Sequence, residues 1–226
     1  SDYTSKYNSN VDFSALFSGT SDSSSVGNTN MLSDYAAIKN GSYGKLMKAY
    51  YAKQDAEKLS GKGDTSQKLT LMKTSADSLK KSADALNDSS LWEKKKIKKK
   101  DEKTGEEIEV EDYDWDKITK AVKSFVEDYN DVVKEAGESN TKDVLRNASW
   151  MTGMTDKNSN MLAKIGITIG KGNKLELDED ALKQADISSL KTVFTGYNSF
   201  VSKISQKATG ISNAANRASA TYTNNG

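Results

Sequence analysis

The sequence predicts a mainly α protein, an elongated antiparallel helical bundle or coiled coil with two small β-hairpins. Three segments repeat apolar residues at alternating steps of three and four, the spacing of a buried helical seam. The chain has no proline, the residue that most strongly interrupts helices. We expect a flexible Ser/Asn-rich leader over residues 1–41, a bundle domain over 42–222 and a tail over 223–226.

The first helical segments are expected between residues 42 and 87. Residues 42–59 carry a weak apolar stripe, and "GKGDTSQ" then breaks the helix, with Asp64 or Thr65 as a suitable N-cap. From residue 65 to 87 the apolar positions become regular, so this segment is the first core helix. Its seam consists of Leu69, Met72, Ala76, Leu79, Ala83 and Leu86.

The segment from Trp92 to Trp115 predicts a charged β-hairpin, inserted near residues 93–112. A basic run, "KKKIKKK", precedes the turn "DEKTGEE", and the acidic run "IEVED" follows it, with Gly105 in the turn. In an antiparallel pair the opposite charges face each other and fix the register. The basic arm alone suggests a polyanion site, but neutralisation by the acidic arm is the favoured interpretation.

A second core helix is predicted over residues 116–137, with Asp114 or Asp116 as its N-cap. Its seam consists of Ile118, Val122, Phe125, Tyr129, Val132 and Ala136. One or two short helices follow, and we expect their packing anchors to be Leu145, Trp150, Met151 and Met154.

A second hairpin is predicted near residues 166–177, with strands at Ile167–Ile169 and Lys174–Leu177. The turn between them is "GKGN", in which Gly170 and Gly172 are expected to supply positive φ. It lacks the spacing of a phosphate-binding loop and does not open a helix. Asp178 is expected to cap the helix that follows.

The longest seam predicts one final helix over residues 189–222. The small residues near its end bury little area, so this part needs a partner helix from the same chain or from another one. The seam consists of Leu190, Phe194, Tyr197, Val201, Ile204, Ala208, Ile211, Ala215, Ala218 and Tyr222. We predict that these residues, except Leu190 and Ala208, form an assembly surface.

The composition argues against several classes of function. Lys and Arg number 33 against 32 Asp and Glu, which gives no electrostatic case for a nucleic-acid partner. The chain has no Cys, and therefore no thiolate nucleophile or thiolate metal ligand. It has no His, the side chain best suited to proton transfer near neutral pH. The acidic clusters at Asp112–Asp116 and Asp178–Asp180 lack EF-hand spacing and suit helix capping. We expect no enzyme activity, cofactor, metal, small-molecule substrate or membrane insertion.

Three stretches follow one another along the chain: "AVKSFVEDYNDVV", "IGITIGKGNKLELDEDALKQA" and "LKTVFTG". Together they resemble the C-terminal region of flagellar filament-capping proteins, the hook-associated protein 2 family. The third stretch loosely matches, at Val193 and Phe194, the step before the family's last coiled-coil helix. The helix motif is matched by Phe125, Val126, Tyr129 and Asn130. The hairpin–helix motif is matched by Gly166, Ile167, Thr168, Gly172, Leu175, Leu177, Asp178 and Leu182.

The resemblance covers about residues 121–222 and implies a structural protein of the bacterial flagellum, extracellular or on the cell surface. Such a protein associates with itself or docks on flagellar axial proteins, and its hairpin braces the terminal helices without a catalytic role. The cap proteins carry large β-domains where this chain has only the charged hairpin, which suggests a reduced relative. An intracellular helical adaptor or export chaperone, in the cytoplasm, is the alternative.

Overall fold

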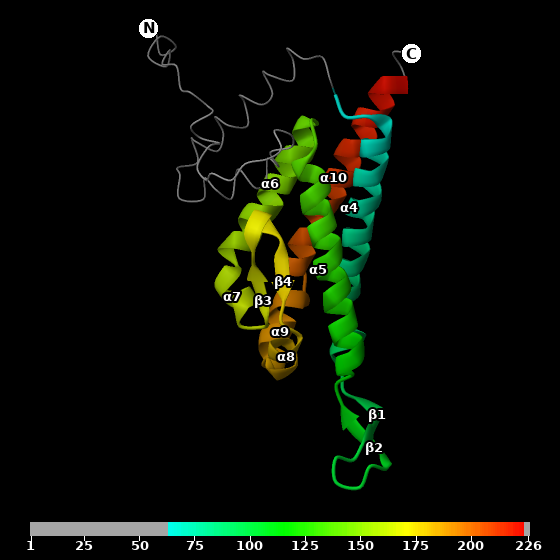
Figure 1. Ribbon diagram of the computed structural model, residues 1–226, viewed down its shortest axis with the longest axis vertical. Coiled ribbons are helices and arrows are strands. Elements are labelled where there is room, and N and C mark those ends of the chain that lie inside the picture. The colour runs from blue at the N-terminus through cyan, green and yellow to red at the C-terminus, as the bar shows by residue number, and fades with distance from the viewer. Residues whose placement is uncertain (1–62, 224–226) are drawn as a thin grey trace, which may run out of the picture.

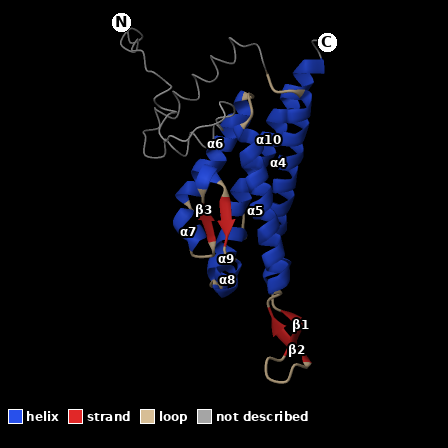
Figure 2. Ribbon diagram, in the orientation of Figure 1, coloured by secondary structure: helices blue, strands red, loops and turns tan. Residues whose placement is uncertain are grey.

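The computed structural model describes residues 63–223 (Figures 1 and 2). The predicted leader and the predicted helix over 42–59 lie outside the described residues, as does most of the tail. Within the described part the protein is mainly helical, with two separate two-stranded antiparallel sheets, as the sequence predicts.

Three long helices lie side by side: α4 (Ser66–Leu86), α5 (Trp115–Gly137) and α10 (Phe200–Thr223). Helix α4 packs along both of the others. Ser205 on α10 contacts Asp84 and Ser212 contacts Asp77, so α4 and α10 are antiparallel. The six buried residues of α4 are the six seam residues predicted from the sequence, and every predicted seam residue of α5 is buried too.

The helices begin where their capping residues predict. The side chain of Thr65 accepts a hydrogen bond from the backbone of Lys68 at 3.2 Å, and Asp114 accepts one from Lys117 at 3.1 Å. Asp64, the alternative cap of α4, has a different role. It is buried, and its carboxylate accepts hydrogen bonds from the loop between α5 and α6: from the hydroxyls of Ser139 and Thr141 and the backbone of Asn140.

The predicted final helix is wrong in one respect, because two helices cover this segment. Helix α9 (Ile187–Phe194) ends before a turn, and α10 begins at Phe200. Gly196 in the turn has φ of +102°, which an α-helix does not accommodate. The side chain of Asn87 binds this glycine twice, at 2.8 Å to its N–H and 3.3 Å to its carbonyl. Ser199 then caps the new helix by accepting a hydrogen bond from Ser202.

A smaller layer lies beside α5 and α10 (Figure 1). It consists of α6 (Lys142–Lys157), α7 (Ser159–Ala163), β3 (Ile167–Ile169), β4 (Leu175–Leu177) and α8 (Glu179–Gln184). Positive φ in the β3–β4 turn occurs at Gly172 and Asn173, so the expectation for Gly170, whose φ is −95°, is wrong. A Cβ at Gly170 would instead lie 2.5 Å from the carboxylate of Glu176.

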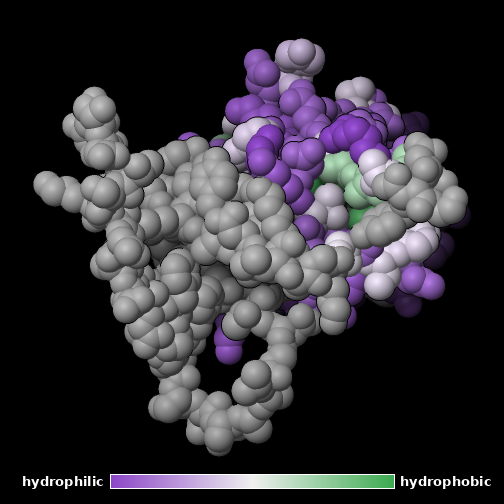
Figure 3. All heavy atoms as spheres, turned by 90° about the horizontal axis from the view of Figure 1, so that it is seen from above, coloured by the Kyte–Doolittle hydropathy of each residue, from purple (hydrophilic) through white to green (hydrophobic). Residues whose placement is uncertain are grey.

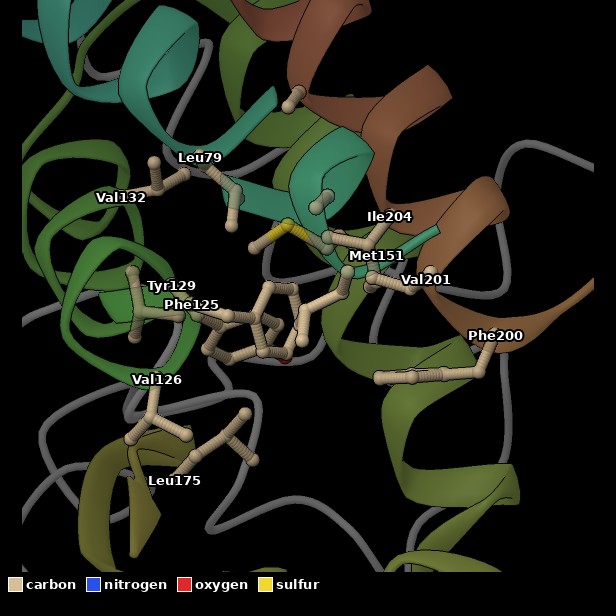
Figure 4. Close-up of a cluster of buried hydrophobic side chains, with 14 of the residues drawn as sticks. Leu79, Phe125, Val126, Tyr129, Val132, Met151, Leu175, Phe200, Val201 and Ile204 are labelled. Carbon is tan, nitrogen blue, oxygen red and sulfur yellow. The ribbon is translucent and has the colours of Figure 1, made fainter. Parts of the chain in front are cut away.

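An aromatic cluster joins α5 and α10 to α9 and to the turn after α4. Trp92, in a 3-10 turn after α4, stacks on Phe194 with ring centroids 5.6 Å apart. Phe125 of α5 meets Phe194 and Phe200 edge to face, and Figure 4 shows it between α5 and α10. Trp150 does not belong to this core: it is 52% exposed, with the ammonium of Lys207 4.5 Å from its ring centroid. Figure 3 shows mainly hydrophilic described surface at the end where α10 terminates.

Candidate functional site

The residues that carry the family resemblance meet in space although they lie far apart in the sequence. Asn130 on α5 donates from Nδ2 to the carbonyl of Leu175 at 2.9 Å and accepts at Oδ1 from the Leu175 N–H at 2.7 Å. Its amide therefore pairs with the start of β4 as a neighbouring strand would. These two hydrogen bonds fix the β3–β4 hairpin to α5, and they satisfy the part-buried backbone N–H and C=O of Leu175.

Gly166 closes the other end of this unit. Its φ is +90°, and its carbonyl accepts a hydrogen bond from the Asp178 N–H at 2.8 Å. A Cβ here would lie 2.7 Å from the carbonyl oxygen of Asp178 and 2.9 Å from the nitrogen of Leu182, so only glycine fits. Asp178 caps α8 through a hydrogen bond from Ala181, as predicted. Ile167 pairs with Leu177 across the hairpin.

Tyr129 links α5 to α6 through its hydroxyl. The hydroxyl donates to Oγ1 of Thr155 at 2.8 Å, and that oxygen donates in turn to the carbonyl of Met151. Tyr129 is fully buried, and burial raises its pKa far above the usual range for tyrosine. The phenol thus stays protonated, and its role is to join two helices. Phe125, one turn earlier, is equally buried in the aromatic cluster.

The predicted assembly seam is largely covered by this chain itself. The residues without exposed surface are Phe194, Val201, Ile204, Ile211 and Ala215, and α10 packs on α4 and α6. Ala218 is partly buried against the same core. Tyr197 is 83% exposed in the turn before α10, so its assignment to the seam is wrong. The side chain of Tyr222 is not among those that the structure describes. For the buried members, the helices that cover the seam belong to the same chain.

A polar ladder that the sequence analysis missed runs beside this seam. Asp77 accepts from Lys73 at 2.8 Å and from Ser212 at 2.6 Å. The arrangement is repeated one heptad further along, where Asp84 accepts hydrogen bonds from Lys80 and Ser205. Burial alone would raise the pKa of either carboxyl, but the hydrogen bonds from lysine and serine outweigh it and lower the pKa. The available signal was the seven-residue spacing of both the aspartates and the serines.

The charged hairpin is confirmed, with strands β1 (Lys95–Lys100) and β2 (Glu107–Asp112). It extends beyond the ends of α4 and α5 (Figure 1). Gly105 lies in its turn with φ of +74°. The register sets the basic strand against the acidic one, and ion pairs join Lys96 to Glu109 and Lys99 to Asp112. The acidic strand thus neutralises the basic one, which weakens the polyanion alternative.

One face of the hairpin is almost entirely charged. It carries Lys96, Lys98 and Lys100 on β1 opposite Glu111, Glu109 and Glu107 on β2. The other face carries the apolar residues, with Ile97 opposite Val110, and Ile108 next to them is 40% exposed.

Within residues 63–223, no group of three or more Asp, Glu, His or Cys side chains is placed to hold a metal ion. None of the helices described is both long and apolar enough to cross a membrane. Comparison of the chain with protein-family models, with curated proteins and with solved structures finds no match.

Proposed function

We propose that this chain is a structural, non-catalytic protein of the flagellar cap-like type, secreted or surface-located, that takes part in the assembly of flagellar axial proteins. Its helical part would then be an elongated antiparallel bundle of the coiled-coil kind. One observation carries the proposal: the resemblance residues form one interlocked unit. Asn130 binds Leu175 across 45 residues of sequence, and Gly166 is closed against Asp178.

The contacts of this unit are those of a brace. The β3–β4 hairpin is tied to α5 by Asn130, and α5 in turn packs on α4 and contacts α6. A brace suits a protein that has to keep its shape between partners. Since α10 buries its seam inside the chain, docking on filament subunits or on further copies would use the exposed surfaces instead.

The test is export. A tagged full-length chain is produced in a flagellated bacterium with an intact flagellar export gate and in a strain without the gate. We expect the chain in the medium and at filament ends only when the gate is intact. Retention in the cytoplasm of both strains would overturn the proposal and favour the intracellular adaptor or chaperone.

A pair of glycine variants ties the result to the folded unit. Gly166→Ala disrupts the contact with Asp178, whereas Gly153→Ala on α6 adds a Cβ into open space. We expect the Gly153 variant to reach filament ends like the wild type and the Gly166 variant to be depleted there. Equal localisation of the two variants would show that the interlocked unit has no part in the function.

A further inference from the structure

The charged hairpin leaves two strand edges without a neighbour in the described part of the chain. Its sheet consists of β1 and β2 alone, so each strand is an edge strand. An edge strand presents unpaired N–H and C=O groups that accept another strand. Isolated two-stranded hairpins are also only marginally stable in water, so an added strand stabilises them.

The register shows which backbone groups face outward. The N–H of Asp101 donates to the carbonyl of Glu106 at 2.8 Å, so these residues form a hydrogen-bonded pair next to the turn. Such pairs alternate with non-hydrogen-bonded pairs along an antiparallel ladder. The outward-facing peptide groups therefore belong to Lys96, Lys98 and Lys100 on β1 and to Glu107, Glu109 and Glu111 on β2.

The two free edges thus carry opposite charges at the positions an incoming strand would pair with. Two β1 edges brought together would align lysines, and two β2 edges would align glutamates, and both arrangements are repulsive. A β1 edge against a β2 edge places ammonium groups opposite carboxylates. The complement of each free edge is consequently the other edge of a second copy of this hairpin.

We propose that the charged hairpin joins copies of this chain head to tail, with β1 of one copy pairing with β2 of the next. The contact is heterologous, because it uses two different edges, and it therefore builds a ring or an open row of copies. Neighbouring strands rotate by about 20–25°, so copies two strands apart differ by about 45°. Because of this rotation, the helical parts of successive copies point in different directions.

The first experiment reverses charges in the full chain and measures mass by light scattering against concentration and salt. The acidic variant is Lys96→Glu/Lys98→Glu/Lys100→Glu, and the basic variant is Glu107→Lys/Glu109→Lys/Glu111→Lys. We expect the wild type to associate and to dissociate as salt rises. Each variant alone is expected to associate at least about tenfold more weakly.

Two combinations restore opposite charges between edges: an equimolar mixture of the acidic and basic variants, and the chain carrying all six substitutions. Only the six-substitution chain also restores opposite charges within its own hairpin, so it separates the contact between copies from the stability of the hairpin. We expect both combinations to recover association. A wild type that stays monomeric at every concentration and salt, or a six-substitution chain that stays monomeric, would overturn the proposal.

A backbone variant tests the edge itself. Lys98→Pro removes one outward-facing N–H that the hairpin does not use internally, and proline is tolerated in edge strands. The matched control, Lys98→Ala, loses the same charge but keeps the N–H. We expect the proline variant to associate several-fold more weakly than the alanine variant. Equal association of the two would rule out strand pairing as the contact.

The proposed contact between hairpins rests on the proposed assembly function, which it would serve. Different results would overturn each of the two proposals. A chain that is exported and reaches filament ends but stays monomeric overturns only the hairpin contact. A chain that associates through its hairpin but is never exported overturns only the flagellar proposal.

Discussion

The side-chain amide of Asn130 pairs with both backbone groups of Leu175, at 2.9 Å to its carbonyl and 2.7 Å to its N–H. This arrangement gives the short strand β4 a partner on α5, because the side-chain amide of Asn130 carries one donor and one acceptor in the same plane. It also gives the asparagine of the helix motif a structural role. The first prediction follows from it.

Replacing Asn130 by Ala should lower the free energy of unfolding by about 2 kcal/mol, because two peptide groups lose their partners in a half-buried place. The measurement is urea denaturation of the purified chain. Asn213→Ala, at an exposed position of α10, is the matched control and should change stability by less than about 0.5 kcal/mol. A loss at Asn130 no larger than that of the control would contradict the clamp.

Two glycine-to-alanine substitutions should have opposite effects. At Gly166 the positive φ and the backbone of Asp178 at 2.7 Å from a Cβ predict a loss of at least about 2 kcal/mol. At Gly153, inside α6 and with no atom within 4 Å of a Cβ, alanine should stabilise by about 0.5–1 kcal/mol. Thermal unfolding of both variants gives the comparison, and a stabilised Gly166 variant would be inconsistent with the structure.

The polar ladder predicts a dependence of stability on pH. The pKa values of Asp77 and Asp84 are lowered from 3.8, so their contribution is present above that pH and is lost as pH falls through the lowered values. Because both side chains are about half exposed, we expect less than about 1 kcal/mol from each. The Asp77→Asn/Asp84→Asn variant should therefore show a shallower loss of stability in acid than the wild type. Parallel curves for the two proteins would refute this.

Asp128 on α5 should behave in the opposite way. Burial, with the charges of Asp131 and Glu127 adding to it, raises its pKa, although the hydroxyl of Ser82 partly offsets this. A raised pKa in the folded state means that the ionised form destabilises the fold at neutral pH. Asp128→Asn should hence be slightly more stable than the wild type at pH 7, and the gain should vanish in acid. Chemical denaturation at both pH values checks this, and a variant less stable at pH 7 would oppose it.

The corrected seam gives the last prediction. Ile204 is fully buried, and Ile204→Ala should cost about 2–5 kcal/mol through lost burial and the cavity left behind. Tyr197 occupies an equivalent position in the sequence pattern but is 83% exposed. Tyr197→Ser should therefore change stability by less than about 0.5 kcal/mol. Guanidinium denaturation of both variants tests this. A large loss of stability in the Tyr197 variant would show that this side chain belongs to the core.

Much of the helical framework was predictable because its signals are local. The seam of α4 and the cap Asp178 follow from the sequence residue by residue, and the caps Thr65 and Asp114 are each one of the two candidates that the sequence offers. Both hairpins lie within a residue or two of their expected positions. A heptad pattern, a capping side chain and a turn glycine each involve residues that lie close together in the sequence.

The break before α10 was missed although the sequence contains a signal for it. Gly196 stands inside the predicted helix, and the steps of three and four continue across it to Tyr197 and Val201. The periodicity persists by coincidence of length, since five residues of turn separate α9 from α10. Asn87, more than a hundred residues earlier, holds the turn in place, and no local pattern reports that contact.

By itself the sequence determined the buried apolar seams of α4 and α5, most of the seam of α10, and candidate caps for α4, α5 and α8. Only the tertiary structure decided what covers those residues, because hydrophobic attraction has no direction and an apolar stripe does not specify its partner. The same holds for the polar contacts: Asp64 finds Ser139 across 75 residues, and Asp77 finds Ser212 across 135. The Asp77–Ser212 bond holds α10 against α4, and this packing places most of the final seam in the interior of this chain.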